Sequence, residues 1–525
     1  AREAAPRVHE FSARQLPKLM WAVAALDASE VEFFRAAAAS CASRRAALSP
    51  AGLANALWAL ARCHAQAAWP ADGSPENLAR EARARAAQFG PQEVANILWA
   101  SAKLDLGGLD ALRPLSLVVQ QRASELSPQN WSNATWAFAT LVIHDAPLFE
   151  LARCEMASKV QSCKPQELAN LVWAFARIND GGMCSIVSDE VVRKVDAFCP
   201  QNVANVAWAC AKTGFGGEQL WNALARACHR PLGAFKAQEV SSLAWAFAAM
   251  VLGDVPAVGA LIAHGHARLS EFSPQGLANF AWASAKLQSS SATFLSAVTA
   301  EASGQLPSLL PQHLSNLAWA WAAGGDSESP GAGLATGRGA DGGALGGVAA
   351  EAARRADAFK AQELANIAWA CSKLGAIDFD TLARIATVAV SMLGEFSAQN
   401  LANFAWALAQ QKTGHAHVLG SISAEVEQRL QEFNAQELSN LSWAFAVGGL
   451  WGQPMGNSDA LAAEFRRRVR CPEIAVPPVP MDLARGAVSH AGAAAAASAA
   501  DHIIGTVWAL RFARRLDDVT LAAAL

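Results

Sequence analysis

The chain has 525 residues, of which 53% are hydrophobic, and a formal net charge of −3 at pH 7. This composition supports a large core, and the near-neutral charge gives no global basic field to attract nucleic acids or anionic membranes. A transmembrane helix is not expected, because no run of about eighteen apolar residues occurs. The first residue is Ala1, and no targeting peptide is visible in this sequence.

One stretch of sequence recurs along the whole chain. Near copies are KPQELANLVWAFARI (Lys164–Ile178), FSPQGLANFAWASAKL (Phe272–Leu287) and KAQELANIAWACSKL (Lys360–Leu374). The unit is anchored on Trp21, Trp58, Trp99, Trp136, Trp173, Trp208, Trp245, Trp282, Trp319, Trp369, Trp406 and Trp443, with a degenerate copy at Trp508. Eight of the twelve intervals are 37 residues, and the others are 35, 41, 50 and 65. Such a period is typical of solenoids built from repeated supersecondary units.

Each copy predicts a helix of about fifteen residues. Ser273 is a candidate N-cap and Pro274 occupies the first helical position, while Ser49, Ser127 and Ser397 play the same part elsewhere. Glu93 stands where the acid of a capping box reaches back. The rest of each period carries a second helical pattern, as in Leu109–Leu126 and Asp378–Phe396. We therefore predict an all-α fold, an α-solenoid of about twelve helix–turn–helix repeats.

The domain organisation follows the register of the repeats. Residues 1–323 are predicted to hold repeats 1–9, and the glycine-rich residues 324–347 a flexible insertion. Repeats 10–12 follow in residues 348–450. Residues 451–525, with proline-rich and alanine-rich stretches, are predicted to form a degenerate C-terminal capping region.

The sequence carries no motif for catalysis, for a metal or for a cofactor. The pairs His264/His266 and His415/His417 have a spacing that places the two rings on different sides of a helix. Cys210 and Cys371 stand where other repeats have Phe or Leu, so we interpret them as core residues in a reducing compartment. We expect a protein that is not an enzyme and that needs no cofactor.

A helical projection separates a core face from a polar face. The core positions of one repeat are predicted to be Val94, Ile97, Leu98, Ser101 and Leu104. The opposite face holds the positions seven before, three before and four after the tryptophan. Seven before is glutamine in ten copies, including Gln92, Gln129, Gln166, Gln201, Gln275, Gln362 and Gln399. Three before is asparagine in ten, including Asn96, Asn133, Asn170, Asn205, Asn279, Asn366 and Asn403. Four after is basic in six: Arg62, Lys103, Arg177, Lys212, Lys286 and Lys373.

Two interpretations of this polar face remain open. Asparagine is unfavourable inside a helix by about 0.5 kcal/mol relative to alanine, so it either bonds between repeats or meets a ligand. Because so uniform a residue cannot discriminate bases, we favour the structural ladder, and we likewise favour inter-repeat packing for the tryptophans. The position six before the tryptophan varies, with Asn130, Asn202 and Asn400 among its residues and Glu in other repeats. It suits either helix capping or the reading of one base per repeat.

These motifs resemble the octotricopeptide/heptatricopeptide repeats, of about 37 residues, found in organellar RNA-binding proteins of algae and protists. The same repeat class accompanies RAP domains and resembles regions of FAST-kinase-like proteins. The resemblance covers roughly residues 10–450. A RAP domain often follows such repeats, but Asp501–Leu525 is too short to contain one, which puts any endonuclease-like activity in doubt.

The resemblance implies a protein that binds single-stranded RNA in a mitochondrion or chloroplast, along the concave face of the solenoid. Transcript stabilisation, RNA processing, translation and ribosome assembly are the implied roles, and other proteins of an organellar ribonucleoprotein are possible partners. The candidate RNA-binding residues are the named glutamines and asparagines with Lys103, Arg177, Lys212, Lys286 and Lys373. The alternative is a protein scaffold or a structural subunit of an organellar ribosome or other assembly, which the near-neutral charge favours.

Overall fold

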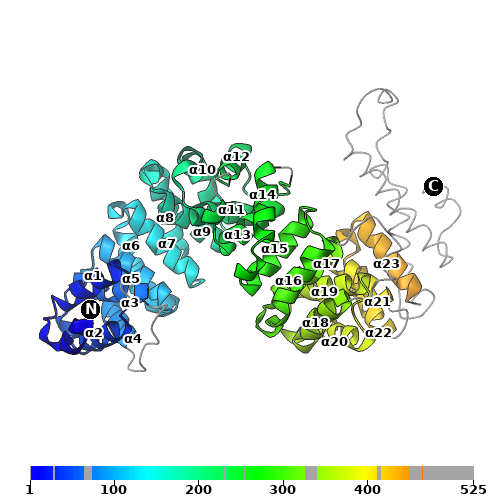
Figure 1. Ribbon diagram of the computed structural model, residues 1–525, viewed down its shortest axis with the longest axis horizontal. Helices are drawn as coiled ribbons and strands as arrows, with labels where there is room; N and C mark the ends of the chain where they lie inside the picture. Colours follow the sequence, from blue (N-terminus) through cyan, green and yellow to red (C-terminus); the bar gives the residue numbers. More distant parts are fainter. Residues whose placement is uncertain are drawn as a thin grey trace, which may run out of the picture. The chain divides into compact units, whose positions relative to one another are not determined.

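Each repeat consists of a helix that carries the repeat tryptophan, here called the tryptophan helix, and a partner helix that follows it (Figure 1). The computed structural model describes residues 2–27, 30–63, 74–228, 232–253, 255–324, 340–410, 415–448 and 464. These residues form α-helices and 3₁₀ turns, and no strand occurs among them. The predicted all-α class with helix–turn–helix repeats is confirmed.

The chain divides into two compact units, Ala1–His264 and Gly265–Leu525, and the division falls within α14 (Pro256–His266). The tryptophan helices of the first unit are α1 (Leu16–Ala25), α3 (Pro50–Cys63), α5 (Pro91–Lys103), α7 (Pro128–Thr140), α9 (Pro165–Arg177), α11 (Pro200–Lys212) and α13 (Ala237–Ala249). Their partner helices are α2 (Val31–Ser43), α4 (Ser74–Ala84), α6 (Leu109–Gln121), α8 (Ala146–Lys159), α10 (Gly182–Lys194), α12 (Glu218–Ala227) and α14.

The second unit repeats the pattern. Its tryptophan helices are α15 (Pro274–Lys286), α17 (Pro311–Gly324), α19 (Ala361–Lys373), α21 (Ala398–Gln410) and α23 (Ala435–Val447). Its partner helices are α16 (Ala292–Ser303), α18 (Ala340–Arg354), α20 (Phe379–Val390) and α22 (Ala416–Gln428). A short 3₁₀ turn precedes most tryptophan helices, for example η4 (Ala86–Gln88) before α5 and η12 (Leu393–Glu395) before α21.

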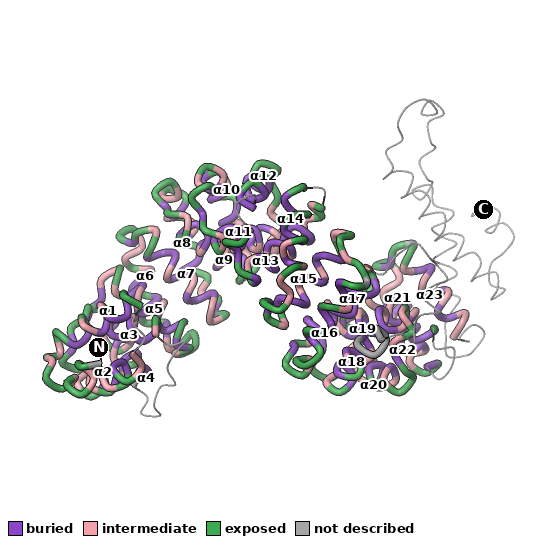
Figure 2. Tube along the Cα trace, in the orientation of Figure 1, coloured by how far each residue is buried: buried purple, intermediate pink, exposed green. Residues whose placement is uncertain are grey.

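Helices pack on their counterparts in the neighbouring repeat. Within the first unit α1 packs on α3, α3 on α5 and so on to α13, and within the second unit α15 to α23 do the same. Partner helices form a second layer in which α4 packs on α6 and α18 on α20. Figure 2 shows buried and exposed residues alternating along the helices, as expected when each helix buries one face. Contacts between consecutive repeats are what define an α-solenoid.

The predicted core positions are buried. Val94, Ile97 and Leu98 are fully buried, and Ser101 and Leu104 are 1% and 7% exposed. Cys210 and Cys371 also lie in the core, and the cysteines in the described ranges are free thiols. The helical projection therefore predicted correctly which side of the tryptophan helix packs inward.

The predicted N-caps are present. The hydroxyl groups of Ser49, Ser127, Ser273 and Ser397 each accept a hydrogen bond, 3.1–3.3 Å long, from the backbone N–H three residues later. Pro128 and Pro274 occupy the first turn of α7 and α15. Serine and proline therefore set where these tryptophan helices begin.

The glycine-rich segment is partly helical. We expected an insertion over residues 324–347, but α17 extends to Gly324 and α18 begins at Ala340. Leu345 and Val348 of α18 are buried at 2% and 0% exposure, so packing in the partner-helix layer outweighs the low helix propensity of glycine. Residues 325–339 and the C-terminal region 451–525, except residue 464, lie outside the described residues.

No helix within the described ranges is both long enough and apolar enough to cross a membrane.

Candidate nucleic-acid interface

The tryptophan helices bring four repeated positions to one face of each unit. We call this face the ribbon: the tryptophan with the residues seven before, three before and four after it. The candidate glutamines are exposed, and the candidate asparagines and the row tryptophans after Trp21 are half-buried. Lys103, Arg177, Lys286 and Lys373 are exposed, whereas Lys212 is half-buried. The positions predicted from the helical projection therefore do share one accessible face within each unit.

The tryptophans of the ribbon contact one another from repeat to repeat. Ring centroids lie 5.9–6.4 Å apart and the ring planes are inclined by 28–41° in the pairs Trp21–Trp58, Trp58–Trp99, Trp99–Trp136, Trp136–Trp173, Trp173–Trp208, Trp282–Trp319 and Trp406–Trp443. Tilted and offset aromatic pairs at this separation are favourable. The expected inter-repeat packing is confirmed, and it leaves each indole half-accessible from the ribbon side.

Five of the six ribbon cations lie over indole rings, and Arg177 makes no such contact within the described residues. The Lys212 ammonium nitrogen lies 5.2 Å from the centroid of the Trp208 ring. The Lys286 ammonium nitrogen lies 5.0 Å from the centroid of the Trp282 ring. Lys103 spans two repeats, with its nitrogen 6.0 Å from the Trp99 ring and 5.0 Å from the Trp136 ring. Arg62 and Lys373 lie over Trp58 and Trp369 in the same way. Cation–π attraction therefore holds these positive charges along the tryptophan row.

Most of these cations have no acidic partner. Within the described ranges, Lys103, Arg177, Lys212, Lys286 and Lys373 form no ion pair with a carboxylate, whereas Arg62 is paired with Asp27 at 2.6 Å. Burial lowers the pKa of Lys212, and the charge of Arg177 lowers it further, while burial alone lowers the pKa of Lys373. Each of the five ends its helix, where a cation also complements the helix dipole. Their charge nevertheless stays available to an anionic ligand.

The asparagine ladder is formed in only part of the chain. The Asn316 amide donates to the Asn279 side-chain oxygen at 3.2 Å, and the Asn366 amide donates to the Ser315 hydroxyl at 3.4 Å. Elsewhere in the described chain, the side chains of Asn96, Asn133, Asn170, Asn205 and Asn403 make no hydrogen bond to protein. The structural interpretation therefore holds for Asn279 and Asn366, and the other amides keep free hydrogen-bonding capacity on the ribbon.

The variable position caps its own helix in many repeats. The carboxylate of Glu167 accepts from the Lys164 N–H at 2.8 Å, and Asn130 Oδ1 accepts from the Ser127 N–H at 3.2 Å. His313 Nδ1 accepts from the Leu310 N–H at 3.3 Å. Asn130 and Asn202 are only 8% exposed. Capping therefore accounts for the choice of residue at this position in these repeats, and a side chain used in this way is poorly placed to read a base.

A second row of cations ties the end of a repeat to its beginning, and the sequence analysis did not identify it. Each member lies at the end of a partner helix or directly after it, and donates to the carbonyl of the residue two before the tryptophan helix of the same repeat. The bonds run from Arg85 to Leu48, Arg122 to Phe89, Lys159 to Leu126, Lys194 to Cys163, Arg355 to Leu309 and Arg429 to Phe396, at 2.7–3.1 Å. We call these residues the clamp cations.

The clamp cations are neutralised by neighbouring glutamates. Lys159 pairs with Glu155 at 2.6 Å, and Lys194 pairs with Glu190 at 2.7 Å, while Glu190 itself is 3% exposed. The spacing of the clamp cations in the sequence could have revealed this row. Arg85, Arg122, Lys159 and Lys194 follow one another at intervals of 37, 37 and 35 residues. Those are the intervals between Trp99, Trp136, Trp173 and Trp208.

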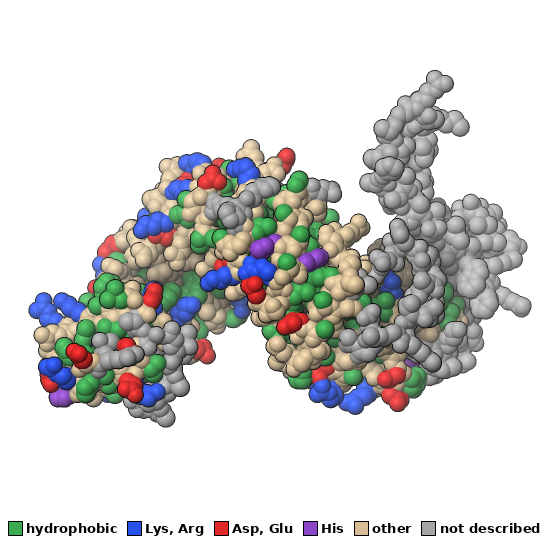
Figure 3. Space-filling model, in the orientation of Figure 1, with side chains coloured by type: hydrophobic (Ala, Val, Ile, Leu, Met, Phe, Trp, Pro, Cys, Tyr) green, Lys and Arg blue, Asp and Glu red, His purple; other side chains and the backbone are tan. Residues whose placement is uncertain are grey.

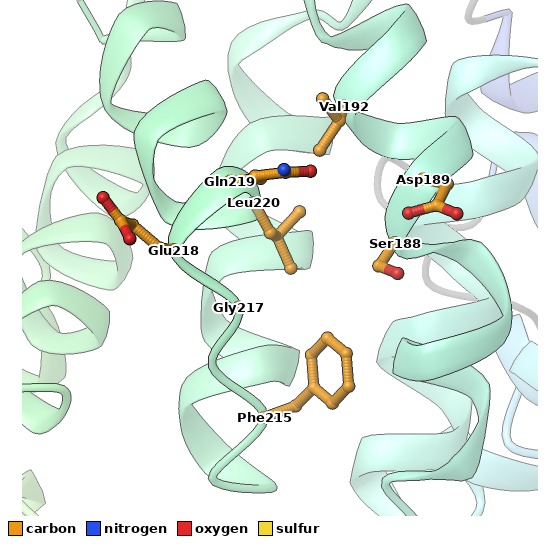
Figure 4. Close-up of a pocket in the computed structure, with 8 residues that line it drawn as sticks. All are labelled: Ser188, Asp189, Val192, Phe215, Gly217, Glu218, Gln219 and Leu220. Carbon is orange, nitrogen blue, oxygen red and sulfur yellow. The ribbon is translucent and has the colours of Figure 1, made fainter.

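Two further features of the described surface do not favour an anion. Figure 3 shows Lys and Arg side chains interspersed with Asp and Glu over the visible face of the described residues. A shallow hollow of about 360 Å³ lies between α10 and the start of α12 and is lined by Ser188, Asp189, Val192, Phe215, Gly217, Glu218, Gln219 and Leu220. Asp189 and Gln219 face one another across it, and Glu218 points away (Figure 4). Its lining contains no cation, so it does not favour phosphate.

The comparisons with known proteins agree with an RNA-related role. The octotricopeptide/heptatricopeptide resemblance stays a prediction, and no curated protein matches the chain. The matched part holds the repeats from Trp21 to Trp245 and amounts to just under half of the 525 residues. Residues 2–255 are similar to the family described as RNA-editing substrate-binding complex 6 protein.

Proposed function

We propose that the chain binds single-stranded RNA along the ribbon as a non-catalytic component of an RNA-processing assembly. The observation that carries the proposal is the row of cations without carboxylate partners, held over half-accessible indoles beside free asparagine amides. Cations match phosphates, aromatic rings match the faces of bases, and amides match polar edges. This combination suits a flexible single strand better than a duplex, whose bases are already stacked on one another.

The set of contacts is narrower than the sequence suggested. We assign phosphate contacts to Lys103, Arg177, Lys212, Lys286 and Lys373, and polar contacts to the exposed glutamines and the unbonded asparagines. Asn130 is left out, because it is buried and caps its helix. Asn202 is left out because it is equally buried. With about one nucleotide per repeat, the seven tryptophan helices of the first unit suit about seven nucleotides, and the five of the second unit suit about five.

The role and the compartment rest on the family resemblance. The name of the matching family refers to RNA editing and to a substrate-binding complex, so RNA and other proteins of such a complex are the partners we propose. Of the two organelles that the repeat resemblance implies, we propose the mitochondrion, which is consistent with a role in an RNA-editing complex. Within such an assembly the ribbon would present an RNA segment to the subunits that process it.

The test is the salt dependence of RNA binding. Changing Lys103, Arg177, Lys212, Lys286 and Lys373 to glutamine removes up to five phosphate contacts. We expect affinity for an unstructured RNA to fall at least ~100-fold near 0.1 M salt, and the slope of log K against log salt to flatten by up to ~3.5. Binding is measured by fluorescence anisotropy over a salt series, with a DNA strand of the same sequence in parallel.

The matched control removes equal charge from the other layer. Arg35, Arg80, Arg113, Arg226 and Arg384 are exposed on partner helices and form no ion pair within the described chain. Their change to glutamine leaves affinity within about 3-fold if the ribbon is the binding surface, because net charge alone has little effect. Equal losses in the two variants contradict the proposal.

The second candidate is a protein scaffold. The net charge of −3 and the interspersed surface charges favour it, because neither concentrates potential over the whole molecule. If the chain is a scaffold, we expect RNA to bind no more tightly than a neutral polymer at low salt. Neither of the two variants with five substitutions should then change RNA binding.

A further inference from the structure

The shallow hollow between α10 and the start of α12 belongs to the partner-helix layer of the first unit. These two partner helices come from consecutive repeats and pack on one another. The volume of the hollow, about 360 Å³, is at the lower end of the ~300–1,000 Å³ that is usual for ligand pockets. It is therefore suited to one small group and not to a length of polymer.

Two polar side chains line opposite walls of the hollow. Asp189 of α10 and Gln219 of α12 face one another across it (Figure 4). Both are exposed, and neither side chain forms a hydrogen bond or an ion pair within the described residues. The lining contains no cation. A ligand in the hollow therefore meets one carboxylate that is not neutralised and one amide that is not hydrogen-bonded, and the oxygens of both accept hydrogen bonds.

Apolar side chains complete the lining. Phe215, in the loop after α11, points its ring into the hollow, and Val192 and Leu220 add aliphatic surface (Figure 4). Leu220 is 3% exposed, while Phe215 and Val192 are half-buried. A Cβ atom added at Gly217 would meet nothing within 4 Å, so the backbone leaves this side open. An occupant can therefore lie against a ring and aliphatic surface while its polar end reaches Asp189.

The repeat scaffold does not require this combination of residues. Phe215 stands seven residues after its repeat tryptophan, where the other eleven regular copies have Ala, Leu, Ile, Asp, Ser or Thr. Asp189 stands five residues before the clamp cation Lys194. Before the other five clamp cations, the residues at this distance are Arg80, Leu117, Cys154, Ala350 and Ala424. The pairing of a carboxylate with an aromatic ring is thus particular to this hollow, and a ligand is one reason for it.

We infer that the hollow receives an arginine side chain of a partner protein. The oxygens of Asp189 and Gln219 accept hydrogen bonds from the guanidinium, whose flat face lies on the Phe215 ring. The methylene stem of the arginine covers the aliphatic wall. Arginine fits better than lysine, because its five donors form a rigid planar fork and its charge is less strongly hydrated. Arginine is also enriched among the residues that dominate the binding energy of protein interfaces.

Nucleic acid suits the hollow less well. A base can bond to Asp189, but its phosphates would then approach the carboxylates of Asp189 and Glu218 with no cation in the lining. The ribbon lies on the tryptophan helices, and it shares no residue with the hollow. The inference therefore goes beyond the proposed function, and it holds equally if the chain is a scaffold.

The test follows the methyl resonances of Val192 and Leu220 by NMR, in the full chain labelled at its valine and leucine methyl groups. The probe is N-acetyl-arginine N-methylamide, which presents the side chain as a protein does. We expect saturable shifts of both resonances with a dissociation constant of about 1 mM, as for a ligand of this size. The citrulline analogue has the same shape without the charge. We expect it to bind at least ~10-fold more weakly, because hydrogen bonds to a charged group are lost.

Two matched variants locate the charge that is recognised. Asp189→Asn keeps the shape of the side chain and removes the carboxylate, and we expect the probe to bind at least ~10-fold more weakly. Glu218→Gln removes an equal charge from a side chain that points away from the hollow (Figure 4). We expect this control to change the affinity by less than about 2-fold, because a distant exposed charge is screened by water.

A third variant tests the ring. Phe215→Leu introduces the residue that stands at this position as Leu106 and Leu252 in two other repeats, so we expect an unchanged urea midpoint. Binding of the arginine probe is expected to weaken about 2- to 5-fold, the range of an exposed cation–π contact. Binding of the citrulline analogue is expected to change less.

The outcomes decide between an arginine site and its alternatives. The inference is overturned if the probe gives no saturable shift at about ten times the expected dissociation constant. Equal affinity for the arginine and citrulline probes, or equal losses in Asp189→Asn and Glu218→Gln, also overturns it. Tighter binding of free arginine than of the blocked probe contradicts a protein partner. If single-stranded RNA shifts the Val192 and Leu220 resonances and the probe does not, the hollow is a base pocket and the inference is wrong.

The ribbon variant with five substitutions separates this inference from the proposed function. We expect it to bind the arginine probe as the wild type does, because none of the five lysines and arginines lines the hollow. A chain that fails to bind RNA but binds the probe contradicts the proposed function alone. A chain that binds RNA but not the probe contradicts the arginine site alone.

Discussion

Two rows of cations recur with the period of the repeats, and they differ in what surrounds them. Lys212 of the ribbon lies over the Trp208 ring and has no carboxylate partner in the described residues. Lys194 of the clamp row pairs with the buried Glu190 and donates to the carbonyls of Gln161 and Cys163 at 2.8 and 2.7 Å. Glu190 neutralises the charge of Lys194 within the protein, whereas no carboxylate of the described residues neutralises the charge of Lys212.

This contrast explains how a chain of net charge −3 can offer a site for a polyanion. Net charge counts all ionisable residues alike. It therefore does not distinguish clamp cations, which neighbouring glutamates neutralise, from ribbon cations, which have no carboxylate partner in the described residues. The charges that matter for binding are those that have no internal partner and are also gathered in one row beside accessible indoles. The comparison predicts that variants in the clamp row affect stability, whereas variants in the ribbon affect RNA affinity.

The largest effect is expected from breaking a clamp. Lys194→Met leaves Glu190, which is 3% exposed, without its lysine and removes the donor from two carbonyls. We expect the free energy of unfolding to fall by about 3 kcal/mol, because a buried carboxylate loses a partner. Urea unfolding followed by circular dichroism measures this. Arg193→Met is the control: this arginine also pairs with Glu190, but its side chain is 57% exposed, so we expect less than about 1 kcal/mol. Equal losses in both variants would show that the clamp contributes no special stability.

A smaller effect separates two asparagines of the ribbon. Asn279→Ala removes the acceptor of the Asn316 amide, so we expect a loss of about 1 kcal/mol in stability. Asn170→Ala breaks no bond within the described chain, and we expect stability to hold or to rise by up to ~0.5 kcal/mol from helix propensity. RNA affinity is expected to fall about 5-fold for Asn170→Ala, because an amide that faces the RNA is lost. The opposite pattern, with Asn170 essential for stability and irrelevant to RNA, contradicts the division.

The smallest effect tests whether the capping position belongs to the fold. Burial lowers the pKa of His313, whose Nδ1 accepts from the Leu310 N–H. The unfolded chain takes up this proton near pH 6.5 and the folded chain only at lower pH, so His313 lowers stability as the pH falls below about 6.5. His313→Asn keeps an acceptor, as Asn130 does in its own repeat. We expect the loss of stability between pH 7 and 5 to shrink by up to ~1 kcal/mol.

The control for this pH effect is His417→Asn, at an exposed histidine of α22. We expect no comparable change in the pH dependence of its urea midpoint. If His313→Asn and His417→Asn behave alike, the buried cap is not the origin of the acid sensitivity.

The fold could be predicted because its determinants are local. Ser273 and Pro274 start a helix whatever lies beyond it, and the spacing of Val94 and Ile97 fixes which face packs inward. The start of α18 at Ala340 was missed for the opposite reason: packing of Leu345 and Val348 decides it, and glycine propensity does not.

The interface could be predicted only in part, because the role of a side chain depends on the next repeat. Asn170 and Asn279 occupy the same position in their repeats, yet only Asn279 receives a bond from a neighbouring asparagine in the described chain. Lys194 donates to carbonyl oxygens more than thirty residues earlier in the chain, and the sequence around Lys194 does not predict these hydrogen bonds. The sequence places these residues on a face, and the packing of repeats decides which of them are free.

The most direct test of the central claim compares Lys212→Gln with Lys194→Gln. These lysines are close in sequence, carry the same charge and differ in their partners. RNA affinity at about 0.1 M salt and the urea midpoint are measured for both variants. The account predicts that Lys212→Gln weakens RNA binding about 5-fold with little change in midpoint, because one phosphate contact is lost. It predicts that Lys194→Gln lowers the midpoint and, while folded, binds RNA as the wild type does. Wild-type affinity in Lys212→Gln, or parallel losses of affinity in two fully folded variants, would contradict it.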